Sequence, residues 1–254
     1  NIILDYLFIA VFHWGIGGAA IATGLGYSIT AIVGLFVFSK KSSLLHFMRP
    51  VCRFKVLGNA VTNGCSEMAS TLVNGIITLM FNWAMLKYVG EDGVAAITII
   101  SYVLAFSGAL YAGYTYGVAP MISFYYGAQN RDKLKKLIGT SLKIIGSIAA
   151  VTVIASLLIT EPLVSVFARP GSPVYDLAVV GNRICSLALL FVGFNIFASG
   201  MFTALSNGII SAVLAFSRTF LFTAIAMLLL PALLGVTGIW LATPVAELMA
   251  IVLS

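Results

Sequence analysis

The chain contains 254 residues, of which 61% are hydrophobic and only 9% are charged, and its mean hydropathy is +1.08. Soluble globular domains carry roughly 25% charged residues, so this composition excludes an ordinary soluble domain and indicates a membrane protein. The net charge of +6 does not indicate a nucleic-acid binder, because the basic residues gather in two short clusters between apolar runs. The three scattered cysteines and two histidines have no metal-ligand spacing, so we expect no metal site.

Long apolar runs, rather than short alternating ones, predict an all-α fold, a polytopic transmembrane helical bundle. The chain begins at Asn1 without an initiator methionine and ends within an apolar run, so we expect it to be a segment of a longer protein. The predicted elements in chain order are a helical remnant near 1–12 and spans near 17–39, 56–88, 94–126, 133–160, 176–205, 209–232 and 236–254.

The charges between the spans alternate along the chain. Two loops are strongly basic, whereas the two turns near 87–92 and 161–176 each sum to a net charge of −1. Cytoplasmic loops of membrane proteins are enriched in Lys and Arg, so we place both basic clusters in the cytoplasm. The residues of the first cluster are Lys40, Lys41, Arg49, Arg53 and Lys55, and those of the second are Arg131, Lys133, Lys135, Lys136 and Lys143.

A short pattern, G-[IV]-x-G-x-x-[IL]-A-T, occurs at Gly15 and again at Gly235. Both copies open a predicted membrane span after a turn on the predicted outer side. Six spans lie between equivalent positions, and an even number of spans preserves orientation, so the pattern predicts parallel rather than inverted repeats.

Glu67 is the only charged residue in the run 56–86. A carboxylate at the centre of a bilayer costs about 2.5–3.5 kcal/mol on insertion scales, so such residues are usually functional. At 100° per residue Glu67 shares one face of its helix with other polar residues, which must face protein or a water-filled cavity. We predict that Glu67 couples transport to an ion, whereas simple interhelical hydrogen bonding remains an alternative for its hydroxyl neighbours. The candidate cavity-lining residues on this face are Asn63, Ser70, Thr71 and Asn74.

Two tyrosines lie deep in the glycine-rich span 94–126. Tyr111 and Tyr114 are candidates to line an aromatic cavity for lipophilic cations, with plain packing as the alternative. Three further polar residues lie within apolar runs. Asn195 lies in the middle of its span, Glu247 is a second buried acid, and Arg218 is a buried cation expected to extend toward the cytoplasmic surface.

Four segments follow one another along the chain: NIILD at 1–5, WGIGGAAIAT at 14–23, GVAPMISFYYGA at 117–128 and GIWLATP at 238–244. Taken in this order, they resemble the multidrug and toxic compound extrusion (MATE) family. The resemblance implies two six-helix lobes, of which this chain covers the end of helix 5 into helix 12. It implies an amino-terminal-lobe part at 1–39, a cytoplasmic linker at 40–55 and the carboxy-terminal lobe at 56–254.

The resemblance also assigns roles to two residues. Glu67 matches the acid of helix 7 that many members use for cation coupling. Asn195 is the candidate partner of Glu67 for ion coupling, because it stands where some branches carry a second acid in helix 10; its amide weakens the expectation of a two-acid Na⁺ site. At the amino terminus Asp5 matches the family's Leu-Asp-Pro run, but Tyr6 replaces the proline.

We therefore expect a secondary active transporter that exports drugs or organic cations across the bacterial plasma membrane by alternating access. The alternative is a lipid-linked oligosaccharide flippase of the same superfamily, which needs a large basic cavity. We expect no enzyme activity, no catalytic residues and no cofactor other than the coupling ion, Na⁺ or H⁺. The expected partners are membrane lipid and a small, cationic and amphipathic substrate, without nucleic acid, and the full-length transporter is expected to be monomeric.

Overall fold

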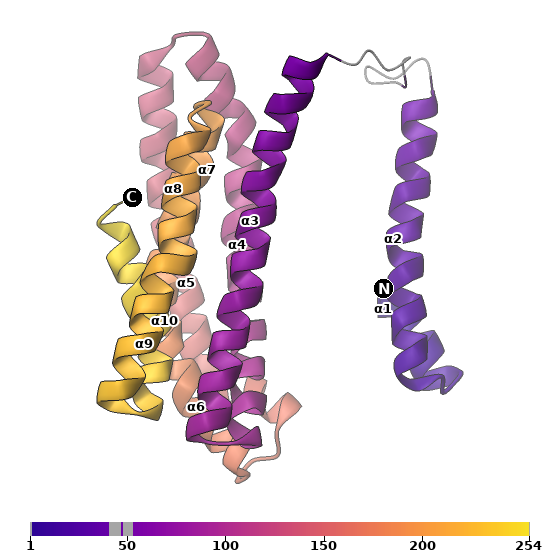
Figure 1. The fold of residues 1–254 in the computed structure, drawn as a ribbon, viewed down its shortest axis with the longest axis vertical. Helices are drawn as coiled ribbons and strands as arrows, with labels where there is room; N and C mark the ends of the chain where they lie inside the picture. The colour runs from indigo at the N-terminus through magenta and orange to yellow at the C-terminus, as the bar shows by residue number, and fades with distance from the viewer. Residues whose placement is uncertain (1, 41–46, 48–52, 254) are drawn as a thin grey trace. The chain divides into compact units, whose positions relative to one another are not determined.

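The computed structural model describes residues 2–40, 47 and 53–253, and within these the side chains of 55, 56 and 59–71 are not described. The chain divides into two compact units, Asn1–Gly58 and Asn59–Ser254, each of which is described by itself (Figure 1). The predicted linker 40–55 lies largely outside the described residues. Its assignment, and that of the two lobes, stays a prediction.

The first unit consists of a short helical segment that folds back against a long helix. The rings of Phe8, Phe12 and Trp14 pack against one another around the turn, with centroids 5.1–6.1 Å apart. The elements are α1 (Ile2–Asp5), the π-helix η1 (Tyr6–Val11) and α2 (Gly15–Ser39).

The second unit is a bundle of helices, and the described part of the chain contains no strand. The side chains of Asn130 and Ser172 cap their helices by accepting hydrogen bonds from backbone N–H groups in the first turn. The elements are α3 (Phe54–Tyr88), α4 (Glu91–Gly127), α5 (Arg131–Phe167), α6 (Pro173–Cys185), the 3₁₀ turn η2 (Ser186–Ala188), α7 (Leu189–Ala204), α8 (Gly208–Phe216), the π-helix η3 (Ser217–Phe222), α9 (Thr223–Leu234) and α10 (Val236–Ile251).

Five helical stretches among the described residues are long and apolar enough to cross a membrane. They confirm the predicted fold class, a polytopic all-α membrane bundle. Helix α4 begins at Glu91, earlier than the predicted span 94–126, because Gly90 with its positive φ of 97° turns the chain directly before it. The five stretches are Gly15–Ser39, Glu91–Gly127, Arg131–Phe167, Pro173–Ala204 and Gly208–Leu234.

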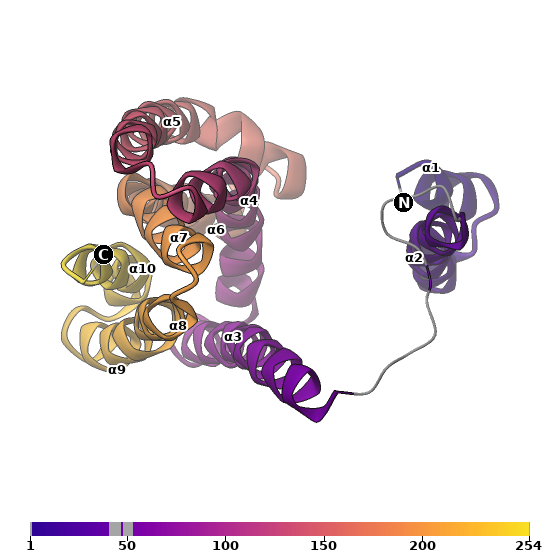
Figure 2. The same cartoon turned by 90° about the horizontal axis from the view of Figure 1, so that it is seen from above.

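Helix α4 packs against α5, α6 and α7, and α10 packs against α6, α7 and α9 (Figure 2). Close approach at these crossings depends on glycine. A Cβ at Gly181 of α6 would lie 2.6 Å from Ile100 of α4 and 2.9 Å from the ring of Trp240 of α10. The indole of Trp240 is buried at this junction, so the small residue fixes how closely the three helices meet.

The repeated sequence pattern corresponds to a repeated local geometry. Gly15 and Gly235 both have positive φ, 56° and 59°, and each lies where a helix begins. Three residues later, Gly18 and Gly238 are buried and their α-carbons face a backbone carbonyl of the preceding segment, that of Phe8 and of Leu230 respectively. Each copy therefore turns the chain with a left-handed glycine and then packs a second glycine on the helix before it.

Candidate functional site

The residue singled out for ion coupling lies outside the described side chains. The backbone of Glu67 is helical and belongs to α3, but its side chain and those of Asn63, Ser70 and Thr71 are not described. Asn74, on the same predicted face, is exposed, and its carbonyl accepts a hydrogen bond from Thr78 Oγ1 at 2.9 Å. The roles assigned to these residues stay predictions.

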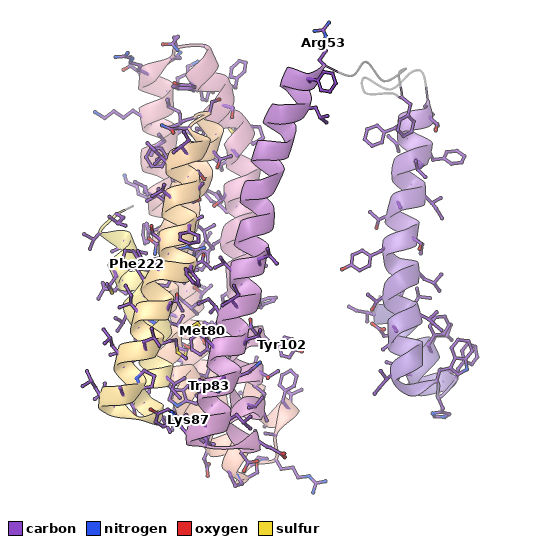
Figure 3. The ribbon with its side chains drawn as sticks, in the orientation of Figure 1. Arg53, Met80, Trp83, Lys87, Tyr102 and Phe222 are labelled. Atoms are coloured by element: carbon purple, nitrogen blue, oxygen red, sulfur yellow. The ribbon has the colours of Figure 1, made fainter. Side chains whose placement is uncertain are left out.

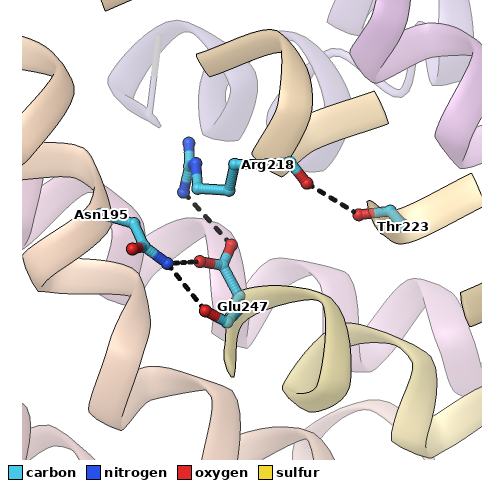
Figure 4. Close-up of polar contacts among 4 residues, drawn as sticks. All are labelled: Asn195, Arg218, Thr223 and Glu247. Atoms are coloured by element: carbon cyan, nitrogen blue, oxygen red, sulfur yellow. Dashed lines mark hydrogen bonds and ion pairs between the residues drawn. The ribbon is translucent and has the colours of Figure 1, made fainter. Parts of the chain in front are cut away.

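The described residues form a different polar centre, built on Asn195 in the middle of α7. The Asn195 side chain is 2% exposed. Its Nδ2 donates two hydrogen bonds to Glu247 of α10, one to Oε2 at 2.7 Å and one to the backbone carbonyl at 3.0 Å (Figure 4). A buried amide that uses both N–H donors on one residue fixes the position of that residue relative to α7.

Arg218 of η3 completes the centre. Its guanidinium donates from Nη1 to Glu247 Oε1 at 3.2 Å, and the two side chains are only 21% and 13% exposed. From the sequence, Arg218 was expected to extend toward the cytoplasmic surface. In the structure its guanidinium instead points to the Glu247 carboxylate. One acid on α10 thereby links α7 and η3 through its two carboxylate oxygens.

Two of the three helices that hold the polar centre, η3 and α10, have interrupted α-helical hydrogen bonding. Arg218 lies in a π-helical segment between α8 and α9, and its carbonyl accepts from Thr223 Oγ1 at 3.2 Å. Such π-helical turns occur frequently at functional sites. In α10, Pro244 lacks an N–H group, which leaves the carbonyl of Trp240 without its helical donor. The thiol of Cys185 donates to that carbonyl at 3.4 Å.

Two polar atoms of the centre are left without partners. Asn195 Oδ1 and Arg218 Nε are buried and make no hydrogen bond among the described residues. Buried polar groups are usually paired, so an unused acceptor and an unused donor beside a carboxylate mark a place where a water or an ion can bind. The Glu247 carboxylate is the group of this centre that can take up a proton. Within the described chain no group of His, Cys, Asp and Glu is arranged to hold a metal.

The two predicted cavity tyrosines lie in the bundle core. Tyr111 is completely buried, and its hydroxyl hydrogen-bonds Thr152 Oγ1 of α5 at 2.7 Å and the carbonyl of Leu189 of α7 at 2.9 Å. Tyr114 donates to Ser141 Oγ of α5 at 3.0 Å. Both hydroxyls therefore connect neighbouring helices in this structure, and the predicted cavity role stays untested.

Sequence reasoning identified the three members of the polar centre but not their association. Arg218 and Glu247 are 29 residues apart and lie on elements that meet only in the folded bundle. Asn195 was predicted as a partner for Glu67, whereas among the described side chains its partner is Glu247. The available signal was that Arg218 and Glu247 are opposite charges in successive apolar runs, and such charges usually pair.

Fold and centre together define a multi-pass membrane protein with buried charges inside its helical bundle. A family model described as MatE matches residues 68–229, more than half of the chain. The chain belongs to the MATE family of membrane transporters, as its sequence resemblance predicted.

Curated relatives include the multidrug export protein MepA of Staphylococcus aureus (strain N315), which is 24% identical over 249 residues. MepA of Staphylococcus haemolyticus (strain JCSC1435) is also 24% identical. Each alignment covers 97% of this chain but 54% of the relative, so the chain spans about half the length of the curated relatives it matches.

Solved structures share the fold. The outward-facing conformation of a multidrug resistance MATE family transporter superposes with a TM-score of 0.86 at 22% identity, covering 99% of this chain and 57% of the other. A transporter of the same superfamily from Pyrococcus furiosus gives a TM-score of 0.87 at 21% identity, with 99% and 57% covered.

Proposed function

We propose that this protein is a cation-coupled efflux transporter that exports amphipathic organic cations across the bacterial plasma membrane by alternating access. The observation that carries the proposal is the buried carboxylate of Glu247, held between Asn195 and Arg218 within a chain of the MATE family. The multidrug export proteins among its relatives support the direction of transport and the class of substrate.

The proposed coupling follows from the charge balance of the centre. Glu247 is held by one cation and one neutral amide, so loading it with a proton or Na⁺ removes the net attraction for Arg218. A ligand shifts a conformational equilibrium only by its differential affinity for the two states. If the ion binds Glu247 more tightly when Arg218 is not paired with it, ion binding favours the conformation in which η3 and α10 lie apart. Glu67 remains the proposed second coupling acid.

The test is efflux of a fluorescent organic cation from cells that produce the protein at its full natural length, under separately imposed H⁺ and Na⁺ gradients. We expect Glu67→Gln and Glu247→Gln to abolish gradient-driven efflux while protein levels in the membrane remain normal. Asp132→Asn, at an exposed helix start, is the matched control and should transport normally. Undiminished efflux by both glutamine variants would refute the coupling assignment.

The flippase alternative is not favoured. A flippase for lipid-linked oligosaccharides needs a cavity lined by several cations, whereas Arg218, the buried cation in the described spans, is already paired with Glu247. The two curated relatives named above are multidrug export proteins.

A further inference from the structure

A large apolar groove opens at one end of the second unit, between α3, α4 and the turn that leads into α6. Its volume is about 1030 Å³, at the upper end of the roughly 300–1,000 Å³ typical of small-molecule sites. Trp83, Tyr102 and Phe167 line it, and all three rings are more than half exposed. Figure 3 shows Trp83 and Tyr102 toward this end of the bundle.

The groove has a polar end and an apolar length. Glu91, at the first residue of α4, and Arg169, in the 168–172 turn, lie at the polar end. Toward the middle of the bundle the lining is mostly apolar as far as Tyr102, with Asn82 and Thr98 as its polar members. Glu91 and Tyr102 are eleven residues apart on α4, a rise of about 16 Å. That is close to half of the roughly 30 Å hydrocarbon core, the depth of one leaflet.

The two charges at the polar end have no partners among the described residues. Glu91 and Arg169 line the same groove but form no ion pair with each other. At the same end of the bundle Arg183 and Glu161 do pair, at 2.7 Å, so these side chains form ion pairs where the geometry allows it. Glu91 and Arg169 can therefore each pair with the opposite charge of one ligand that carries both a cationic and an anionic group.

Neighbouring groups add donors suited to a phosphate. The hydroxyl of Ser172 accepts from the Tyr175 N–H, which leaves its own hydrogen free to donate. The Lys87 ammonium lies 5.1 Å from the centre of the Trp83 ring at the groove rim. Tryptophan, tyrosine and basic residues of this kind are enriched where a bilayer meets water.

We propose that this groove binds a zwitterionic phospholipid, phosphatidylethanolamine, from the leaflet on the predicted outer side. The lipid phosphate accepts hydrogen bonds from Arg169 and Ser172, and the lipid ammonium donates to the Glu91 carboxylate. One acyl chain lies along the apolar length beside Trp83 and Tyr102. The site is separate from the Asn195–Glu247 centre, and the proposal does not depend on the transport mechanism.

The test is native mass spectrometry of the full-length protein in detergent, titrated with phosphatidylethanolamine, phosphatidylglycerol or the organic cation tetraphenylphosphonium. We expect Arg169→Ala and Glu91→Gln each to weaken phosphatidylethanolamine binding by about fivefold, the loss expected for one exposed charge contact. Glu91→Gln should leave phosphatidylglycerol binding unchanged, because that lipid has no ammonium.

Matched controls separate the groove from general surface charge. Asp92→Asn removes the exposed acid next to Glu91 that does not line the groove, and Arg131→Ala removes an exposed arginine at a different helix start. Both should bind phosphatidylethanolamine as the unmodified protein does. Equal binding by all four variants would overturn the proposal, as would a Glu91→Gln protein that loses tetraphenylphosphonium but keeps the lipid.

Discussion

The ion pair between Arg218 and Glu247 makes a quantitative prediction about stability. Replacing Arg218 with methionine keeps the length of the side chain but leaves the Glu247 carboxylate without its cation. Replacing Glu247 with glutamine leaves the guanidinium unpaired, although the amide oxygen can still accept from Asn195. The double variant removes both charges and keeps the hydrogen bond from Asn195. Its loss of unfolding free energy should therefore be smaller than the sum of the losses in the two single variants.

The structure sets the expected magnitude. Both side chains are largely buried, 21% and 13% exposed, so solvent screens the pair weakly. Breaking a buried pair by removing one partner costs about 3–5 kcal/mol. The contact is a single hydrogen bond at 3.2 Å, and Asn195 still holds the carboxylate in the Arg218→Met variant. We therefore expect Arg218→Met to lower the free energy of unfolding by an amount near the lower bound, about 3 kcal/mol. The double-mutant cycle should give a coupling energy of about 2 kcal/mol between Arg218 and Glu247.

The assay is reversible unfolding of the purified full-length protein in mixed micelles by increasing SDS, followed by circular dichroism. The Arg183–Glu161 pair is the control, because its side chains are 52% and 60% exposed. A cycle on that pair should give at most about 0.5 kcal/mol. The reasoning fails if the Arg218–Glu247 cycle gives no more coupling than this exposed pair.

Two further substitutions test the polar centre and the packing of the core. Asn195→Asp places a second carboxylate where the amide now donates to Glu247 Oε2 at 2.7 Å. Two carboxylates at that distance cannot both ionise. The variant should therefore lose thermal stability as the pH rises from 5 to 8. Constant stability across that range would contradict it. Gly193→Ala puts a methyl group 2.6 Å from the ring of Tyr111 and should cost about 1–3 kcal/mol in SDS unfolding. Gly113→Ala, which meets nothing within 4 Å, is the control, and an equal loss there would refute the packing argument.

The all-α bundle was predictable because apolar runs long enough to span a bilayer leave few alternatives to helices. The ends of the helices were less predictable. The span expected to start near residue 94 begins earlier, at Glu91, because Gly90 with its positive φ turns the chain directly before it. Helix α4 also runs through Pro120 as far as Gly127.

The candidate site was predictable in its members and not in its arrangement. Arg218 and Glu247 stand out in the sequence because isolated charges are costly in apolar runs. Their pairing depends on how η3 and α10 approach each other, and the π-helical turn that holds Arg218 leaves no mark in the hydrophobic pattern. Asn195 was predicted to act with Glu67, and that role stays a prediction; among the described side chains tertiary packing brings the Asn195 amide to Glu247.

The contacts of α10 also bear on the order in which the protein is assembled. As a single inserted helix, α10 would carry two costly groups within hydrocarbon, the Glu247 carboxylate and the Trp240 carbonyl that Pro244 leaves unbonded. The groups that satisfy them, Cys185, Asn195 and Arg218, all precede α10 in the chain. During synthesis these three residues are therefore in the membrane before α10. The Glu247 carboxylate and the Trp240 carbonyl can then form their hydrogen bonds as α10 inserts, without first being exposed to lipid.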